Sequence, residues 1–293
     1  MFNPTPEPSK DDSRKMKITL PVSQDLILTI GDDRNGRIVY PTSLLKKGFG
    51  LNYRGLDLAE EAVGFGLPVL KQGLQTYFPG ELDLNFLHGD KAQGVTAAFT
   101  INLVEKIARP GRASVDNRLF YAVKNYLAAF IRSVPLARDS LTVLSSNLRR
   151  LFGWETTYEK DGFSAKVEMI YEVDEKSGVL AVEANLVSLP QDGITEVIVM
   201  NEQGAHYFDQ YHDSTGASLA GKEIGCWDEV AASEAGFASS NQRVAFTLPR
   251  VPGARLFRGR ELIGSRLAWA GFGYSFPPAI SRFNYSVKIE VLP

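Results

Sequence analysis

The sequence predicts a mostly-β protein built around a large antiparallel β-sandwich, and three observations lead to this prediction. Short runs rich in β-branched and aromatic residues recur along most of the chain and are separated by turn residues. Two of these runs, residues 163–173 and 179–189, flank the turn sequence DEKSG and form the clearest β-hairpin. No repeat has the length that is typical of a solenoid or a propeller. Regularly spaced strands of this kind favour a sandwich resembling a supersandwich.

The first part of the chain contains an expected flexible arm followed by strands. Residues 1–15 are polar, charged and rich in proline, so we expect a loosely attached N-terminal arm without the apolar core of a signal peptide. Residues 16–22 and 25–30 are short strand candidates, and residues 94–107 form a longer one. The longer run places five apolar side chains on one face, namely Val95, Ala97, Phe99, Ile101 and Leu103.

Residues 114–152 interrupt the β pattern. Apolar residues recur there at nearly 3.6-residue spacing in two runs on either side of Pro135. Ser114 or Asp116 is available as the N-cap of the first run and Asp139 as that of the second. This spacing predicts a two-helix hairpin inserted into a single sandwich domain that spans residues 16–293.

Strands return after Trp154. In the hairpin, alternate residues from Phe163 to Val173 are apolar and share one face, whereas the other face is mostly charged. Further strand candidates follow at residues 195–201, 205–212, 242–249, 265–276 and 284–292.

Composition narrows the classes of partner. The chain has 32 basic and 34 acidic residues, and a net charge of −2 gives no broad attraction for nucleic acid or for an anionic membrane surface. No uncharged apolar run approaches the roughly 18 residues that span a bilayer. The single cysteine, Cys226, excludes an intramolecular disulfide and a cysteine metal cage, so a cytoplasmic location is expected. We find no phosphate loop, dinucleotide fingerprint, paired-histidine zinc helix or serine-hydrolase elbow, and we expect no cofactor. The oligomeric state stays open.

Two of the three histidines of the chain lie in the segment 201–217. If residues 205–212 form a straight strand, His206 and His212 are about 20 Å apart, too far to bind one metal ion. A bend near Asp209 would allow a metal site built from His206, Asp209 and His212. The alternatives are a sheet surface without chemistry, or one histidine that acts as an acid, a base or a ligand donor, since its pKa is close to neutral.

Carboxylates concentrate in residues 56–90, among glycines and aromatic residues. Glycosyl chemistry needs two carboxylates, one of which burial keeps protonated. Glu81 and Glu61 are the better candidates, because their partly apolar flanks favour a raised pKa. The alternative is an ordinary solvated surface.

Several other residues are candidates for ligand binding. Tyrosines and tryptophans offer stacking surfaces, although tryptophans also serve as core anchors, and arginines of the segment 250–266 can clamp an anion or simply form a charged loop. These candidates are Tyr207, Tyr211, Arg258, Arg260, Trp227 and Trp269.

The tripeptide Gly-Phe-Gly occurs at residues 48–50, 64–66 and 271–273. Glycines in a strand mark bulges or allow a ligand or another backbone to approach closely, and bulges are the favoured interpretation.

The hairpin at 163–189, the many-stranded remainder and the total length resemble the galactose mutarotase-like supersandwich, a grouping that includes sugar epimerases and the β-domains of polysaccharide lyases. The resemblance covers residues 16–110 and 154–293, and the helical hairpin departs from the simple epimerase pattern. It implies that a histidine and a glutamate act as acid and base on a ring-opening sugar. His206 or His212 would supply the imidazole.

The leading hypothesis is therefore a protein that binds or acts on a carbohydrate, acidic sugars included, with a small molecule or an oligosaccharide as its ligand. An enzyme of this kind would catalyse epimerisation or elimination with His206 or His212, Asp209 and a carboxylate such as Glu81. It requires a concave sheet face on which an imidazole and a carboxylate converge within about 6 Å. The first rival is a non-catalytic sandwich that binds a ligand or a partner, and the second is a metal-dependent enzyme that uses the segment 206–213.

Overall fold

The computed structural model describes residues 17–31, 45–60, 62–88, 93–108, 155–190, 193–263 and 267–293. Within these ranges most residues lie in β-strands, as predicted, and there is one short 3-10 helix, η3 (Gly221–Ile224). No helix among these residues is long and apolar enough to span a membrane. The predicted arm at 1–15 and the predicted helical hairpin at 114–152 lie outside the described residues.

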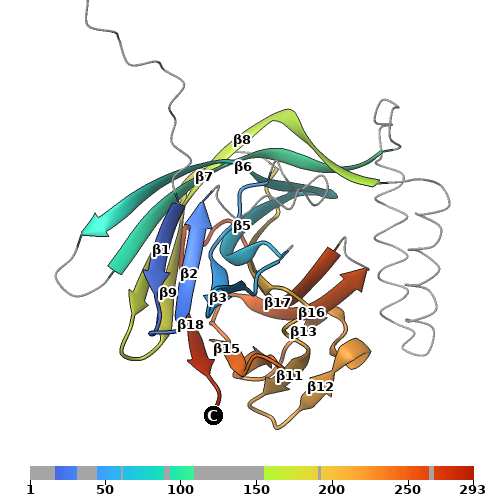
Figure 1. The fold of residues 1–293 in the computed structure, drawn as a ribbon. Coiled ribbons are helices and arrows are strands. Elements are labelled where there is room, and N and C mark those ends of the chain that lie inside the picture. Colours follow the sequence, from blue (N-terminus) through green and yellow to red (C-terminus); the bar gives the residue numbers. More distant parts are fainter. Residues whose placement is uncertain are drawn as a thin grey trace, which may run out of the picture.

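The described strands form two antiparallel sheets (Figure 1). The smaller sheet has the order β1-β2-β3-β4. Its strands are β1 (Lys17–Pro21), β2 (Leu26–Gly31), β3 (Gly50–Tyr53) and β4 (Leu56–Asp57).

The larger sheet has fourteen described strands in the order β12-β11-β14-β15-β18-β9-β8-β7-β6-β5-β10-β17-β16-β13. Its first strands along the chain are β5 (Gly64–Gln72), β6 (Gln75–His88), β7 (Gln93–Ala108), β8 (Glu155–Asp174), β9 (Val179–Ser188), β10 (Glu196–Gln203) and β11 (Gln210–Asp213). The others are β12 (Ser218–Ala220), β13 (Cys226–Glu229), β14 (Glu234–Ala238), β15 (Val244–Pro249), β16 (Arg255–Ile263), β17 (Leu267–Phe276) and β18 (Arg282–Val291).

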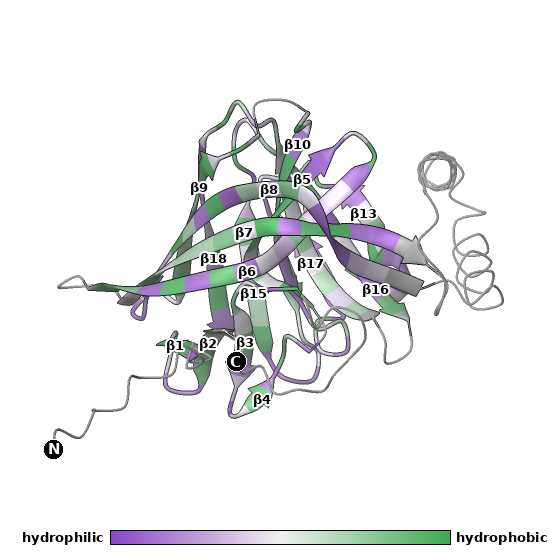
Figure 2. Ribbon diagram, turned by 90° about the horizontal axis from the view of Figure 1, so that it is seen from above, coloured by the Kyte–Doolittle hydropathy of each residue, from purple (hydrophilic) through white to green (hydrophobic). Residues whose placement is uncertain are grey.

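The predicted hairpin is confirmed as β8 and β9, and the predicted strand at 94–107 is confirmed within β7. Their apolar residues alternate with polar ones, so that hydrophilic and hydrophobic colours follow each other along these strands (Figure 2). All five predicted inward residues of β7, from Val95 to Leu103, are buried.

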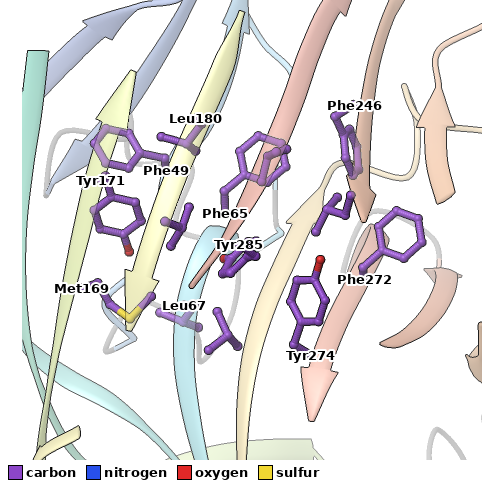
Figure 3. Packing of buried hydrophobic residues seen from close by; sticks show 14 of the residues in the cluster. Phe49, Phe65, Leu67, Met169, Tyr171, Leu180, Phe246, Phe272, Tyr274 and Tyr285 are labelled. Atoms are coloured by element: carbon purple, nitrogen blue, oxygen red, sulfur yellow. The ribbon is translucent and has the colours of Figure 1, made fainter. Parts of the chain in front are cut away.

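Aromatic side chains from several strands of the large sheet pack together in the hydrophobic core (Figure 3). Phe49, which precedes β3, packs edge-on against Tyr171 of β8, and Phe65 of β5 packs edge-on against Phe246 of β15. The inward residues of β1, β2 and β3 belong to the same cluster, so the small sheet covers the inner face of the large one.

All three Gly-Phe-Gly tripeptides mark close contacts within the protein. The pairing of β10 with β5 shifts register between Met200 and Asn201 and passes over Gly66, which confirms a bulge there. A Cβ atom on Gly48 would lie 2.0 Å from the carbonyl oxygen of Phe65, and one on Gly271 would lie 2.1 Å from that of Asn201. The close approach is therefore made by the protein's own backbone.

The end of β10 is held by buried amides. Asn201 Oδ1 accepts hydrogen bonds from the Gly66 N–H and the Tyr285 hydroxyl, at 3.1 and 2.7 Å. Gln203 Oε1 accepts from the Leu51 N–H at 3.0 Å. Because Asn201 and Gln203 point into the core, the residue between them, Glu202, points to the opposite face of the sheet.

Candidate functional site

Neighbouring strands β10, β17 and β16 present a face that is turned away from the aromatic core. The strand register places Glu202 opposite Gly271, which in turn lies opposite Gly259. Trp269 lies directly opposite Glu261 on the same face. We call this surface the tryptophan face and define it by Glu202, Trp227, Phe257, Glu261 and Trp269, with β13 contributing Trp227 at its edge.

Glycines form the floor of the tryptophan face. A Cβ atom on Gly273 would lie 2.2 Å from Cη2 of Trp227, and one on Gly259 would lie 2.5 Å from Cη2 of Trp269. The benzene edges of both indoles therefore lie directly on the backbone. Both tryptophans are half-buried, and Trp227 is stacked parallel to Phe257 with ring centroids 5.5 Å apart.

The tryptophan face also carries two carboxyl groups. Glu261 Oε2 accepts a hydrogen bond from Trp269 Nε1 at 3.3 Å. Glu202 is only 5% exposed, and its burial raises the pKa of its carboxyl group to about 8. The Val63 N–H, which bonds to Glu202, and the charge of Lys47 lower this pKa, while the negative charge of Glu261 raises it.

An imidazole and a carboxylate meet where β10 ends. His206 Nδ1 lies 2.6 Å from Glu60 Oε2, and the two side chains are 43% and 25% exposed. Gly204 allows Glu60 to lie against the backbone, since a Cβ atom there would be 2.9 Å from Glu60 Oε2, and the Gly204 N–H donates to the Leu58 carbonyl. Glu60 adopts a positive φ of 45°, which is uncommon for a residue with a side chain. No other described residue bonds to the His206 ring.

The predicted strand at 205–212 is only partly present. Residues 205–207 form a turn, and β11 begins at Gln210, so His206 and His212 do not share a straight strand. His212 is exposed on β11 with its ring against Gly236. Asp209 accepts hydrogen bonds from the backbone and the hydroxyl of Ser240, at 3.0 and 2.7 Å.

His206, Asp209 and His212 therefore do not come together as metal ligands. His206 contacts Glu60, Asp209 contacts Ser240, and the His212 ring lies against Gly236. Within the part of the chain that the structure describes, no group of three or more His, Cys, Asp or Glu residues is arranged to hold a metal ion.

Tyr211, Arg258 and Arg260 lie on the core side of the sheet, away from the tryptophans. Tyr211 is buried, its hydroxyl donates to Asp213 at 2.7 Å, and the Arg258 guanidinium lies 4.6 Å from its ring centroid. Burial, assisted by the bond to Asp213, raises the pKa of Tyr211 to about 12. Arg258 donates to the Ile224 carbonyl and Arg260 to the Ala205 carbonyl. Both arginines thus brace the segment 205–225 against β16.

Tyr207 is half-buried in the turn that carries His206. It packs against the hydrophobic core.

Glu81 is not close to either histidine. Its Oε1 accepts from Lys160 at 2.9 Å and from Asn102 at 3.1 Å, and these bonds lower the pKa of Glu81. The expected raised pKa was wrong, because the side chain is 56% exposed and paired with a cation. Glu61 lies outside the described residues.

Sequence reasoning passed over the carboxylates that the fold brings to the site. Glu60 lies in the acidic segment 56–90, where the sequence favoured Glu61 and Glu81 instead. Glu202 and Glu261 carry no motif, and their only signal is the alternation of β10 and β16, which places each of them on the face opposite the core.

Comparisons with known proteins gave the following results. No family model matches the chain, and no curated protein matches it. Among solved structures, it is similar to the alpha-N-acetylgalactosaminidase NagBb from Bifidobacterium bifidum. The complex with GalNAc is 11% identical with a TM-score of 0.48, and the complex with Gal-NHAc-DNJ is 11% identical with a TM-score of 0.49. Each match covers 94% of this chain, which spans only 36% of the length of that enzyme.

Proposed function

We propose that the chain binds carbohydrate on the tryptophan face. The observation that carries this proposal is the placement of Trp227 and Trp269, two half-buried indoles lying on a glycine floor beside Glu202 and Glu261. Sugars present apolar C–H faces that stack on aromatic rings, and hydroxyl groups that donate to carboxylates. A mostly apolar surface with a few fixed polar groups is the usual composition of a small-molecule site.

The rigidity of the two indoles favours binding over a purely structural role. Phe257 holds Trp227 by stacking, and Glu261 holds Trp269 through its indole N–H. Rings that are already ordered lose little conformational entropy when a ligand stacks on them.

Calorimetric titration with a panel of oligosaccharides tests this proposal. We expect Trp269→Ala and Trp227→Ala each to weaken binding about tenfold or more, since truncating an aromatic anchor commonly costs over ~1 kcal/mol. Phe86→Ala removes an exposed aromatic ring of β6 and serves as the control, with affinity unchanged. Undiminished binding by both tryptophan variants would rule out this face.

A second candidate function, proton transfer on a sugar, is supported by the His206–Glu60 pair. The imidazole of His206 lies 2.6 Å from the carboxyl group of Glu60. In this proposal Glu60 replaces Glu81 as the carboxylate that works with the histidine. A carboxylate that accepts the Nδ1–H orients the ring and leaves Nε2 to take a proton from a substrate. Epimerisation and elimination both begin with such a step.

Deuterium incorporation into sugars in D₂O, followed by NMR, tests the second function. We expect His206→Ala and Glu60→Gln to lower the exchange rate about 10²- to 10⁴-fold, the usual contribution of a general base. His212→Ala changes the other exposed histidine of this segment and should leave the rate unaltered. A fully active His206→Ala variant would eliminate this second function.

A further inference from the structure

Building on the proposed carbohydrate function, we propose that the tryptophan face binds an extended oligosaccharide along β16, with separate sugar units on Trp269 and Trp227 and a further unit beside Arg255. One indole would suffice to stack a single sugar. The arrangement of the two indoles along β16, at one edge of the large sheet, favours a chain of several units instead (Figure 1).

Trp227 and Trp269 offer two separate stacking positions. The benzene edge of Trp269 lies on Gly259 of β16, whereas that of Trp227 lies on Gly273 of β17. In the register of these strands Gly259 pairs with Gly271, two positions from Gly273. Gly259 and Gly273 are therefore diagonal neighbours, about 7–8 Å apart. Two neighbouring positions at this separation suit consecutive sugar units of one chain.

The floor between the two positions is made of glycine. A Cβ atom on Gly259 would lie 2.5 Å from Cη2 of Trp269 and 2.8 Å from the backbone nitrogen of Trp227. Gly271, opposite Gly259, has no side chain either. These glycines place no wall between the indoles, so a sugar chain can pass from one ring to the other.

A β-bulge turns Trp227 onto this face. The pairing of β13 with β16 shifts register between Cys226 and Asp228, and Trp227, which lies between them, has a positive φ of 67°. Consecutive residues of a regular strand point to opposite faces, whereas a bulge changes the direction of a side chain. A positive φ is strained for a bulky residue, and such strain is concentrated at ligand sites. The strain therefore favours a binding role for the second indole.

The strip that faces the ligand continues along β16 beyond the indoles. Alternate residues of the strand share this face, namely Arg255, Phe257, Gly259 and Glu261. Six residues at about 3.3 Å each span about 20 Å, which is the length of several sugar units. Arg255, at the far end, has a side chain that is 58% exposed and lies over the Phe257 ring. Its Nη2 donates to Glu196, and a guanidinium has five N–H donors, so donors remain for sugar hydroxyl groups.

Three β-1,4-linked series provide the probes, built from glucose, from galactose and from N-acetylglucosamine, each as the single sugar, the disaccharide and the tetrasaccharide. In calorimetric titrations we expect the tetrasaccharide of the tightest-binding series to bind about a hundredfold more tightly than its single sugar. The second indole and Arg255 are each expected to contribute about tenfold. A single sugar too weak to detect beside a bound tetrasaccharide meets the same expectation.

A substitution at the far end of the strip tests the direction of the chain. We expect Arg255→Ala to weaken binding of the tetrasaccharide about tenfold and to leave the disaccharide, which covers only the two indoles, unchanged. Arg282→Ala removes an exposed arginine of β18 that is likewise paired with a glutamate, and it should alter neither affinity. The wild-type series needs no substitution and decides alone should Arg255→Ala fail to fold.

The outcomes separate the extended binding mode from the proposed function. Equal affinity for the single sugar and the tetrasaccharide overturns the extended mode and leaves carbohydrate binding standing. The same holds if Arg255→Ala binds the tetrasaccharide as tightly as the wild type, or weakens the disaccharide just as much. Failure of every sugar to bind overturns both.

Discussion

Glu202 occupies the second-last position of β10, where alternation turns it away from the core amides on either side. Gly271 of the neighbouring strand β17 lies close to Glu202. A Cβ atom on Gly271 would be 2.7 Å from the Cα atom of Glu202. Glu202 is only 5% exposed, and this burial favours the neutral form of its carboxyl group.

The stability of the protein should fall with rising pH because of this residue. With a folded pKa near 8 and a reference value of 4.5, the native state binds one more proton than the unfolded state between those values. Stability is therefore lost at up to about 1.4 kcal/mol per pH unit in this window and levels off above it. Denaturant unfolding from pH 5 to 9 should show the slope in the wild type and its absence in Glu202→Gln. Parallel curves for the two proteins would contradict the account.

The catalytic candidates illustrate what sequence can predict at the level of residues. His206 was a candidate because histidine is the side chain suited to proton transfer near neutral pH. Its partner could not be identified, because Glu60 lies 146 positions earlier and reaches the imidazole through a loop that crosses the end of β10. Such a contact forms only when distant parts of the chain fold together, so no pattern in the neighbouring sequence predicts it.

The strands β10 and β17 approach each other closely at Gly271. A Cβ atom at this position would lie 2.1 Å from the Asn201 carbonyl oxygen, so Gly271→Ala must push the two strands apart. We expect a loss of about 1–3 kcal/mol, the usual cost of overpacking, in denaturant unfolding. Gly162→Ala, where nothing lies within 4 Å, is the control and should be nearly neutral. Equal stability of both variants would show that this close contact is unimportant.

The elements that were predicted correctly are those in which the residues that alternate as apolar in the sequence are also the ones buried in the structure. The β8–β9 hairpin has a turn sequence and an apolar face that is buried, as in Val167, Met169 and Tyr171. The segment 205–212 alternates similarly, but Tyr207 N–H and Phe208 N–H both donate to the Gly204 carbonyl and close a turn. The turn satisfies these backbone groups locally, so no strand forms before Gln210.

At the scale of the whole molecule, a net charge of −2 gives no broad attraction for a charged partner, so ligand binding depends on local groups. The antiparallel sandwich was predictable from strand spacing and the absence of repeats. The tryptophan face was not, because β10, β16 and β17 become neighbours only through long-range pairing.

The central claim is that carbohydrate stacks on Trp227 and Trp269, and NMR of the indole N–H groups tests it most directly. The chain contains three tryptophans, so single substitutions suffice to assign their resonances. On titration with a binding oligosaccharide, we expect the Trp227 and Trp269 resonances to shift together and to saturate with the same Kd. Saturating binding that leaves both resonances unmoved would contradict the claim.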